Sequence, residues 1–276
     1  MTPRLRSLAG SLPAAIAVGG LSLLAIGGLI SRSLRPGSLI GGALSTDAWT
    51  RVLADPAFRS AVWFTLLAAF IATVVAVAVS VPLGLALRKR GRRTNAVMGF
   101  LIPVPHLVVA ATTVAWFGPG RLLDRLVGEV PIVGDRLGLG VILVYVVKEI
   151  PFLVLLIGAA LDGATRELDE AAQSLGASWW DRWRYVLGPR LVWPLGLGAL
   201  VVAAFVVGST EVPLVIGPLK PDSITTYAIS ITRVRGPIAR ADAAVALTIS
   251  TIVIIACAGV ALAALGVSSR RRGTRR

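Results

Sequence analysis

Two adjacent residues of opposite charge interrupt a long apolar stretch and are the first candidates for chemistry. Lys148 and Glu149 lie near the middle of the run from 141 to 161. A charge inside such a run is costly in a membrane and normally faces protein or water. Neighbouring residues on a helix point about 100° apart, so these two cannot form a simple face-to-face pair. They predict either a polar lining of a path through the membrane or a salt bridge to another helix.

Two further polar residues belong to the same setting. Glu211 directly follows an uncharged run, either as an acid that favours a cation at the mouth of such a path or as a solvated loop residue. His106 follows Pro103 and Pro105 inside the third apolar run. Prolines break the backbone hydrogen-bond ladder, which lipid tolerates only where protein or a water-filled cavity satisfies the freed carbonyls. We therefore expect the third run to lie beside the path and His106 to be a packed polar residue.

The counts of reactive residues exclude several chemistries. With a single histidine and a single cysteine, Cys257, the chain cannot build a His/Cys metal cluster or an intramolecular disulfide. None of its lysines follows a glycine, so the chain lacks the P-loop that cradles nucleotide phosphates. We expect no catalytic residue, no metal, no cofactor and no ATP hydrolysis by this chain itself.

The apolar runs predict a membrane protein. The chain is 55% hydrophobic and only 15% charged, and a stretch of about 20 apolar residues crosses the hydrocarbon core as a helix. We predict an all-α membrane protein with six transmembrane helices, at residues 12–30, 60–87, 94–120, 141–161, 191–210 and 243–269. The first span is also compatible with a cleaved signal peptide, although its apolar part exceeds the usual core of about 7–15 residues.

The basic residues are explained by membrane topology. The net charge of +14 is concentrated at the ends of apolar runs, for example in the cluster 88–93, so we expect no nucleic-acid partner. The side of the membrane that holds both termini carries more Lys and Arg than the other side. By the positive-inside rule, both termini and the segment between the fourth and fifth spans are cytoplasmic. Within the basic tail, 268–276, the stretch 270–276 is expected to be disordered.

The segment between the fourth and fifth spans is polar, yet its pattern is typical of two short helices. Thr165 is placed to N-cap the first helix, and Gly176 to end it in the left-handed conformation. Ser178 and Asp181 form a capping box for the second helix, and Pro189 marks the entry to the next span. One narrow apolar face is expected on the first helix, made by Leu168, Ala171, Ala172 and Leu175.

The spacing of this segment resembles a known motif. Glu170-Ala171-Ala172, three residues, Gly176, nine residues, Val186 and then Pro189 are similar to the EAA loop of binding-protein-dependent ABC importer permeases. The segment departs from the motif at Val186, where isoleucine is usual, and at Gly188, where leucine is usual. Neither change removes the turn or the small-residue face. We call residues 165–189 the coupling segment.

Two other stretches add to the resemblance. Pro151-Phe152 in the fourth span is similar to a pair that the family carries there. The stretch 209–217, which reads Ser-Thr-Glu-Val-Pro-Leu-Val-Ile-Gly, resembles the permease branch that serves polyamines, ferric iron, thiamine or sulfate. The resemblance implies the type I ABC importer permease fold and one of these solutes as substrate.

In that family the loop docks into a cleft on a cytoplasmic ATP-binding subunit. The resemblance therefore implies an ATPase-subunit interface made by Glu170, Ala171, Ala172, Leu175 and Gly176, with Lys148, Glu149 and Glu211 as candidates for the pathway. It implies as partners ATP-binding cassette subunits that hydrolyse the ATP, a second permease subunit, identical or homologous, an extracytoplasmic substrate-binding protein, and membrane lipid. The chain would be a multi-pass protein of the bacterial inner membrane that works by alternating access.

The resemblance covers roughly residues 60–267, the expected permease core domain. A membrane helix and an external connection precede it at 1–59, and the basic tail follows it at 268–276. Two other functions remain open: a secondary transporter driven by an ion gradient, with the same three charges as coupling groups, and a membrane enzyme or scaffold without transport. Internal inverted repeats would support the secondary transporter, and none is evident in the sequence.

Overall fold

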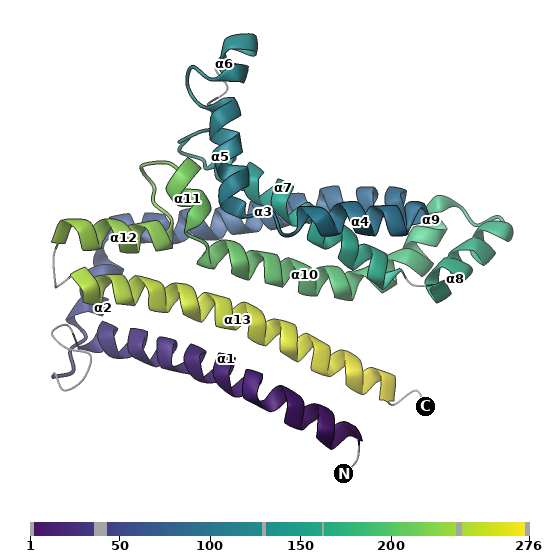
Figure 1. The fold of residues 1–276 in the computed structure, drawn as a ribbon, viewed down its shortest axis with the longest axis horizontal. Helices are drawn as coiled ribbons and strands as arrows, with labels where there is room; N and C mark the ends of the chain where they lie inside the picture. Colours follow the sequence, from purple (N-terminus) through teal and green to yellow (C-terminus); the bar gives the residue numbers. More distant parts are fainter. Residues whose placement is uncertain (1–2, 36–42, 129–130, 162, 236–238, 274–276) are drawn as a thin grey trace. The chain divides into compact units, whose positions relative to one another are not determined.

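The computed structural model describes residues 3–35, 43–128, 131–161, 163–235 and 239–273, and the regular secondary structure in these ranges is helical (Figure 1). In chain order the elements are α1 (Pro3–Leu34), α2 (Asp47–Ala54), α3 (Pro56–Leu87), the 3-10 turn η1 (Arg88–Arg90), α4 (Arg92–Leu101), α5 (His106–Phe117), α6 (Leu122–Val127), α7 (Leu139–Ala160), α8 (Gly163–Ser174), α9 (Trp179–Arg182), the π turn η2 (Trp183–Leu187), α10 (Gly188–Gly208), α11 (Glu211–Ile216), α12 (Ile224–Arg235) and α13 (Ala239–Gly273).

The membrane spans follow the predicted apolar runs. Within the described residues, five helical stretches are long and apolar enough to cross a membrane: Ile16–Leu34, Pro56–Leu87, Leu139–Ala160, Trp179–Gly208 and Ala239–Ala263. The bent pair α4 and α5 makes a sixth span if its two helices are counted together. The predicted all-α class with six transmembrane helices is therefore confirmed.

The third span is broken rather than continuous. Helices α4 and α5 meet at an angle of 80°, and Pro103 and Pro105 lie in the break between them. A proline removes one backbone donor, and its ring clashes with the carbonyl four residues earlier, so two prolines in three residues end a helix. The predicted interruption of this run is thus a sharp bend with a new helix beginning at His106.

The chain forms two compact units, and the first comprises Met1–Ser60 and Ile224–Ile252. In this unit Arg51 of α2 forms a salt bridge of 2.7 Å with Asp242 of α13, whose side chain is buried. The Tyr227 hydroxyl of α12 donates to the Asp55 carboxylate at 2.8 Å, and its ring lies against Phe58. These two polar contacts therefore attach α2 to α13 and the residue after α2, Asp55, to α12.

The second unit comprises Ala61–Ser223 and Val253–Arg276 and is built around α7. Helix α7 packs against α4, α5 and α10, and its buried side chains include Tyr145, Leu153 and Ile157. Glycines let the neighbouring helices approach closely. A Cβ on Gly84 of α3 would lie 2.9 Å from Ile157, and one on Gly198 of α10 would lie 2.5 Å from Leu156. This packed core carries the elements described next.

Three predicted boundaries were wrong. Helix α8 begins at Gly163, so Thr165 does not cap it but lies buried inside its first turn. Helix α9 does not stand alone, because it continues through η2 into α10 without a break. Helix α13 extends to Gly273, so residues 270–273 are helical rather than disordered, as suits arginine, a good helix former. Residues 274–276 of the predicted tail lie outside the described residues.

Candidate functional site

The coupling segment contains the predicted glycine turn. Gly176 has a φ of +79°, in the left-handed region that glycine adopts without strain. Its N–H donates to the Gln173 carbonyl, and the Ala177 N–H donates to the Ala172 carbonyl, both at 3.0 Å. This pair of bonds is a Schellman motif, which satisfies carbonyls at the end of α8. The prediction that Gly176 ends the first helix is confirmed.

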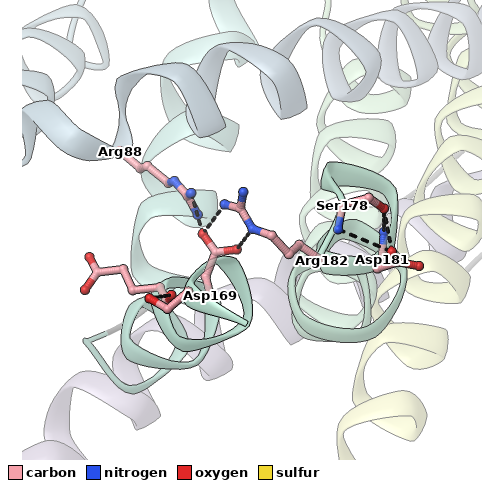
Figure 2. A network of polar contacts seen from close by, with 7 residues as sticks. Arg88, Asp169, Ser178, Asp181 and Arg182 are labelled. Atoms are coloured by element: carbon pink, nitrogen blue, oxygen red, sulfur yellow. Dashed lines mark hydrogen bonds and ion pairs between the residues drawn. The ribbon is translucent and has the colours of Figure 1, made fainter. Parts of the chain in front are cut away.

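The capping box of the second helix is also confirmed. The Asp181 N–H donates to the Ser178 hydroxyl at 3.2 Å, and the Ser178 N–H donates to the Asp181 carboxylate at 3.3 Å (Figure 2). Each side chain thus satisfies a backbone donor that the first helical turn leaves without a partner. The turn between α8 and α9 is therefore held by groups within a few residues of it.

A π turn joins the coupling segment to α10. The Gly188 N–H donates to the Trp183 carbonyl, five residues earlier, directly before Pro189, which has no N–H to donate. A Cβ on Gly188 would lie only 2.7 Å from that carbonyl oxygen. Gly188, where the motif usually has leucine, therefore fits the π turn, because a side chain there would come too close to the Trp183 carbonyl. As a result, the second helix of the segment and the fifth span are one continuous rod.

The buried carboxylate of Asp169 ties α8 to two other elements. Arg182 of α9 donates to both of its oxygens, from Nε at 2.7 Å and from a terminal nitrogen at 2.8 Å. Arg88 of η1, directly after α3, donates to the second oxygen at 2.5 Å. Figure 2 shows the two guanidinium groups reaching this carboxylate from different sides. Asp169 is only 2% exposed, so this charge is satisfied by protein rather than by water.

The ionisation of Asp169 follows from these contacts. Hydrogen bonds from Arg182, and then from Arg88, hold the pKa of Asp169 below its usual value, although burial acts to raise it. A second tie lies one turn earlier, where Arg190 of α10 donates to the Thr165 hydroxyl at 3.0 Å. Helix α8 is therefore fixed along one side to α9, α10 and the end of α3.

An apolar groove of about 380 Å³ runs between α8 and the start of α10. Its lining includes all four residues of the predicted apolar face, Leu168, Ala171, Ala172 and Leu175, together with Tyr185, Val186, Pro189 and Arg190. Two of these side chains are strongly exposed, Leu175 by 88% and Tyr185 by 70%. Within the second unit, the described residues leave this apolar surface exposed.

Glu170 lies away from that groove. It lines a separate polar cleft of about 470 Å³, together with Arg88, Thr165, Arg166 and Asp169. Its carboxylate lies 3.6 Å from the Arg166 guanidinium, and both side chains are mostly exposed. The residues predicted as one interface therefore present two surfaces, one apolar and one polar, on different sides of α8.

The intramembrane charges Lys148 and Glu149 both reach the broken span. The Lys148 ammonium donates to the Ile102 carbonyl in the break at 2.7 Å, and the Lys148 side chain is buried. The Glu149 carboxylate lies 3.0 Å from Nε2 of His106, the first residue of α5. Two adjacent residues of α7 thus hold the two sides of one bend.

His106 is packed between aromatic rings. Its ring centroid lies 4.5 Å from that of Phe205 and 6.2 Å from that of Tyr145. Glu211 is exposed and begins α11, a short helix that packs against α5. The structure therefore brings Lys148, Glu149 and His106 together at the bend and places Glu211 on a different element.

Asp169 and Arg88 were missed as site residues by the sequence reasoning. Asp169 was not singled out, and Arg88 was interpreted only as part of the basic cluster 88–93 that indicates membrane topology. One signal was present: Thr165 and Asp169 are four residues apart and so share a face of α8, next to the apolar face. The partners of that face, on η1, α9 and α10, follow only from the tertiary structure.

Comparison with known proteins identifies the family. The family model described as "binding-protein-dependent transport system inner membrane component" matches residues 76–271. Over 190 residues the chain is 28% identical to the inner membrane ABC transporter permease protein YnjC of Escherichia coli strain K12, covering 68% of this chain and 37% of that protein. It is 34% identical over 170 residues to a probable molybdenum ABC transporter permease protein of Haloferax volcanii, covering 57% and 58% of the two chains.

Each of these alignments spans less than two thirds of the relative's own length. The fold also matches solved structures. The crystal structure of a bacterial ABC transporter involved in the import of the acidic polysaccharide alginate has a TM-score of 0.66 at 15% identity, covering 94% of this chain and 98% of that chain. A structure of bacterial alginate ABC transporter in complex with alginate pentasaccharide-bound periplasmic protein has a TM-score of 0.65 at 16% identity, covering 91% and 94%.

The comparisons also bear on the open alternatives. Molybdenum and alginate, which the names of these proteins give as their cargo, lie outside the four predicted solutes, so the substrate is not restricted to polyamine, ferric iron, thiamine or sulfate. The family match sets aside the secondary transporter and the scaffold. The chain belongs to the binding-protein-dependent transport system inner membrane components, as a multi-pass permease subunit of an ABC importer.

Proposed function

We propose that the coupling segment of this permease is the docking element for a separate ATP-binding subunit, which hydrolyses the ATP. The observation that carries this proposal is the apolar groove along α8. Leu168 and Leu175 are 50% and 88% exposed, on a helix that lies outside the candidate membrane spans. Apolar surface exposed on a helix outside the lipid is stabilised when a protein partner covers it. The small residues Ala171 and Ala172 allow that partner to approach closely.

The ties on the other side of α8 support a mechanical role. A docked partner displaces the spans only if the docked helix is firmly connected to them. Helix α8 meets α9 and the end of α3 through Asp169, and α9 is continuous with α10. A movement of the docked partner would therefore be transmitted through α8 to α3 and α10, as one step of an alternating-access cycle. Glu170, exposed beside the polar cleft, would contact the rim of the partner's surface.

The same proposal sets the topology and the domain organisation. The charge bias of the sequence supports cytoplasmic termini and a cytoplasmic coupling segment, because Lys and Arg collect on that side. Residues 60–267 would form the permease core, with 1–59 as an added helix and connection and 268–276 as a basic tail. An ATP-binding subunit in the cytoplasm could then reach the groove.

We further propose a second permease subunit, identical or homologous, and an extracytoplasmic substrate-binding protein as partners. The family description names a binding protein, and the alginate transporter with the similar fold was solved with a periplasmic protein bound to its substrate. The cargo would be a solute delivered by such a protein. The relatives support no narrower class of solute, because the substrates in their names differ.

Lys148 and Glu149 would fix the shape of the pathway rather than present free charges to the solute. Both side chains are already engaged at the bend between α4 and α5. In this proposal they hold α5 at its angle beside the path, while Glu211, exposed on α11, is the remaining candidate for a charge that meets the solute.

Co-purification tests the docking proposal. The intact chain, a Leu175→Glu variant and a matched Leu219→Glu variant would be purified from their own membranes. Leu219 is 95% exposed and lies outside the coupling segment, so it controls for the added charge. We expect an ATP-hydrolysing subunit to accompany the parent and the control but not Leu175→Glu. Equal recovery with all three, or with none, would overturn the proposal.

A further inference from the structure

The carboxylate of Asp169 joins elements that do not follow one another in the chain. Its two partners lie 13 and 81 positions away, Arg182 on α9 and Arg88 at the end of α3. The neighbouring pair Arg166–Glu170 on the same helix is local and solvent-exposed. Exposed ion pairs of that kind contribute little to stability. Among the ion pairs of α8 in the described residues, the long-range contacts therefore converge on Asp169.

The two arginines connect α8 to different parts of the permease. Arg182 belongs to the rod formed by α9, η2 and α10, which the coupling segment already contains. Arg88 belongs to η1, which directly follows α3, and α3 has no covalent connection to the coupling segment except through the intervening spans. The bond between Arg88 and Asp169 is therefore a direct route from the coupling segment to α3.

We propose that Asp169 is a positioning residue that transmits the movement of the coupling segment to α3 through Arg88, in addition to the movement that α10 receives through its continuous helix. This inference rests on the proposed function, because it requires an ATP-binding subunit to move the segment. A buried carboxylate held by three charge-assisted hydrogen bonds is a short, directional link. Arg88 in turn sits one residue beyond α3, so a displacement of α8 is applied at the end of that helix.

The contacts of Asp169 also determine which substitution separates the link to α3 from the link to α9. Substitution of Asp169 would leave two guanidinium groups without their carboxylate and could unfold the segment. Arg88→Gln is milder, because the bidentate pair between Asp169 and Arg182 remains intact. Arg88→Lys keeps the positive charge and can restore the link. Arg90→Gln removes an equal charge from the same basic stretch and is the matched control.

The experiment uses the full chain in nanodiscs with its ATP-binding subunits. In a Cys257→Ser background, an environment-sensitive fluorophore is attached through a single cysteine either at Phe70 on α3 or at Val201 on α10. Both native side chains are well exposed, by 66% and 56%, so a label there displaces little packing. The signal measured is the fluorescence change between ADP and ATP with vanadate.

In the parent and in Arg90→Gln, both reporters are expected to respond to ATP. In Arg88→Gln, the α3 reporter is expected to lose its response while the α10 reporter keeps it, and Arg88→Lys should restore the α3 response. Retention of both responses in Arg88→Gln, or loss of both, would overturn the inference while leaving the docking proposal in place. Absence of ATP-binding subunits from the parent complex would instead overturn the proposed function, and this inference with it.

Discussion

Two helix breaks in this permease are closed in opposite ways. At Gly176 the freed backbone groups are satisfied within six residues, by the Schellman bonds and by the capping box that follows. At the break between α4 and α5, the Ile102 carbonyl accepts from Lys148, 46 positions away, and His106 meets Glu149, 43 positions away. One break is closed by its own segment, whereas the other has one local bond, from the Val104 N–H to the Leu101 carbonyl at 3.3 Å, and also depends on side chains of a different helix.

The surroundings of the breaks explain the difference. The Gly176 turn follows α8, a helix outside the candidate membrane spans, whereas the other break lies between α4 and α5, which together are apolar enough to enter a membrane. Lipid offers no hydrogen bonds, so a break inside a span must find its partners in the protein. The coupling segment can therefore move as one body without losing its turn, but the bend at 102–105 depends on α7 staying in place.

The largest effect is expected from Asp169→Ala, which breaks the long-range ties of the otherwise self-contained segment. It leaves Arg88 and Arg182, both mostly buried, without their carboxylate. We expect the free energy of unfolding to fall by about 3 kcal/mol, the lower end for a buried pair that loses one member. Detergent-induced unfolding, followed by circular dichroism, measures it. A loss below about 1 kcal/mol would mean that α8 is held by its local caps alone.

A smaller effect is expected from Lys148→Met at the membrane break. Methionine fills a similar volume but leaves the Ile102 carbonyl without its donor, at a cost of about 2 kcal/mol for an unsatisfied buried group. Val147→Met changes the exposed neighbouring residue and should leave stability nearly unchanged. The same unfolding assay applies. Equal stability of the Lys148 variant and the control would show that the bend does not depend on α7.

Gly176→Ala tests the local closure directly. A Cβ at this position meets no atom within 4 Å, so only the positive φ is unfavourable. We expect a loss of about 1 kcal/mol in the free energy of unfolding. Gly163→Ala, in a helix and equally open, should be neutral or slightly stabilising. If both alanines had the same effect, the left-handed turn would not be present.

The smallest effect on stability is expected from a change of pH that stays above the acidic range. The pKa of Asp169 is lower in the folded chain than in the unfolded chain, so its stabilisation is fully present above the unfolded pKa, about 3.9, and is lost as pH falls through the folded pKa. The stability difference between the parent and Asp169→Asn should stay constant from about pH 8 to pH 5 and shrink below about pH 4. A decrease in that difference near neutral pH would contradict the ion-pair geometry.

The two breaks also show how far the sequence alone could lead. The Gly176 turn and the Ser178–Asp181 box were predicted because each depends on residues within a single turn. The kink at Pro103 and Pro105 was foreseen for the same reason. The six spans were predictable because lipid requires long apolar runs.

What could not be predicted depends on distant partners. Thr165 was expected to cap α8, but its hydroxyl accepts from Arg190, 25 positions on, inside the helix. Nothing near Asp169 in the sequence indicates that Arg88 reaches it from 81 positions away. The roles of Lys148 and Glu149 were left open between a lining and a bridge, because the position of α5 relative to α7 comes only from the tertiary packing.

Site-specific photocrosslinking tests the central claim, that the groove along α8 is where the ATP-binding subunit docks. A photoreactive amino acid replaces Leu175 in one variant and Leu219 in another, both strongly exposed, in native membranes. The account predicts a crosslink from position 175 to the ATP-binding subunit, identified by mass spectrometry, and none from position 219. A functional transporter that gives no crosslink to that subunit from position 175 would contradict it.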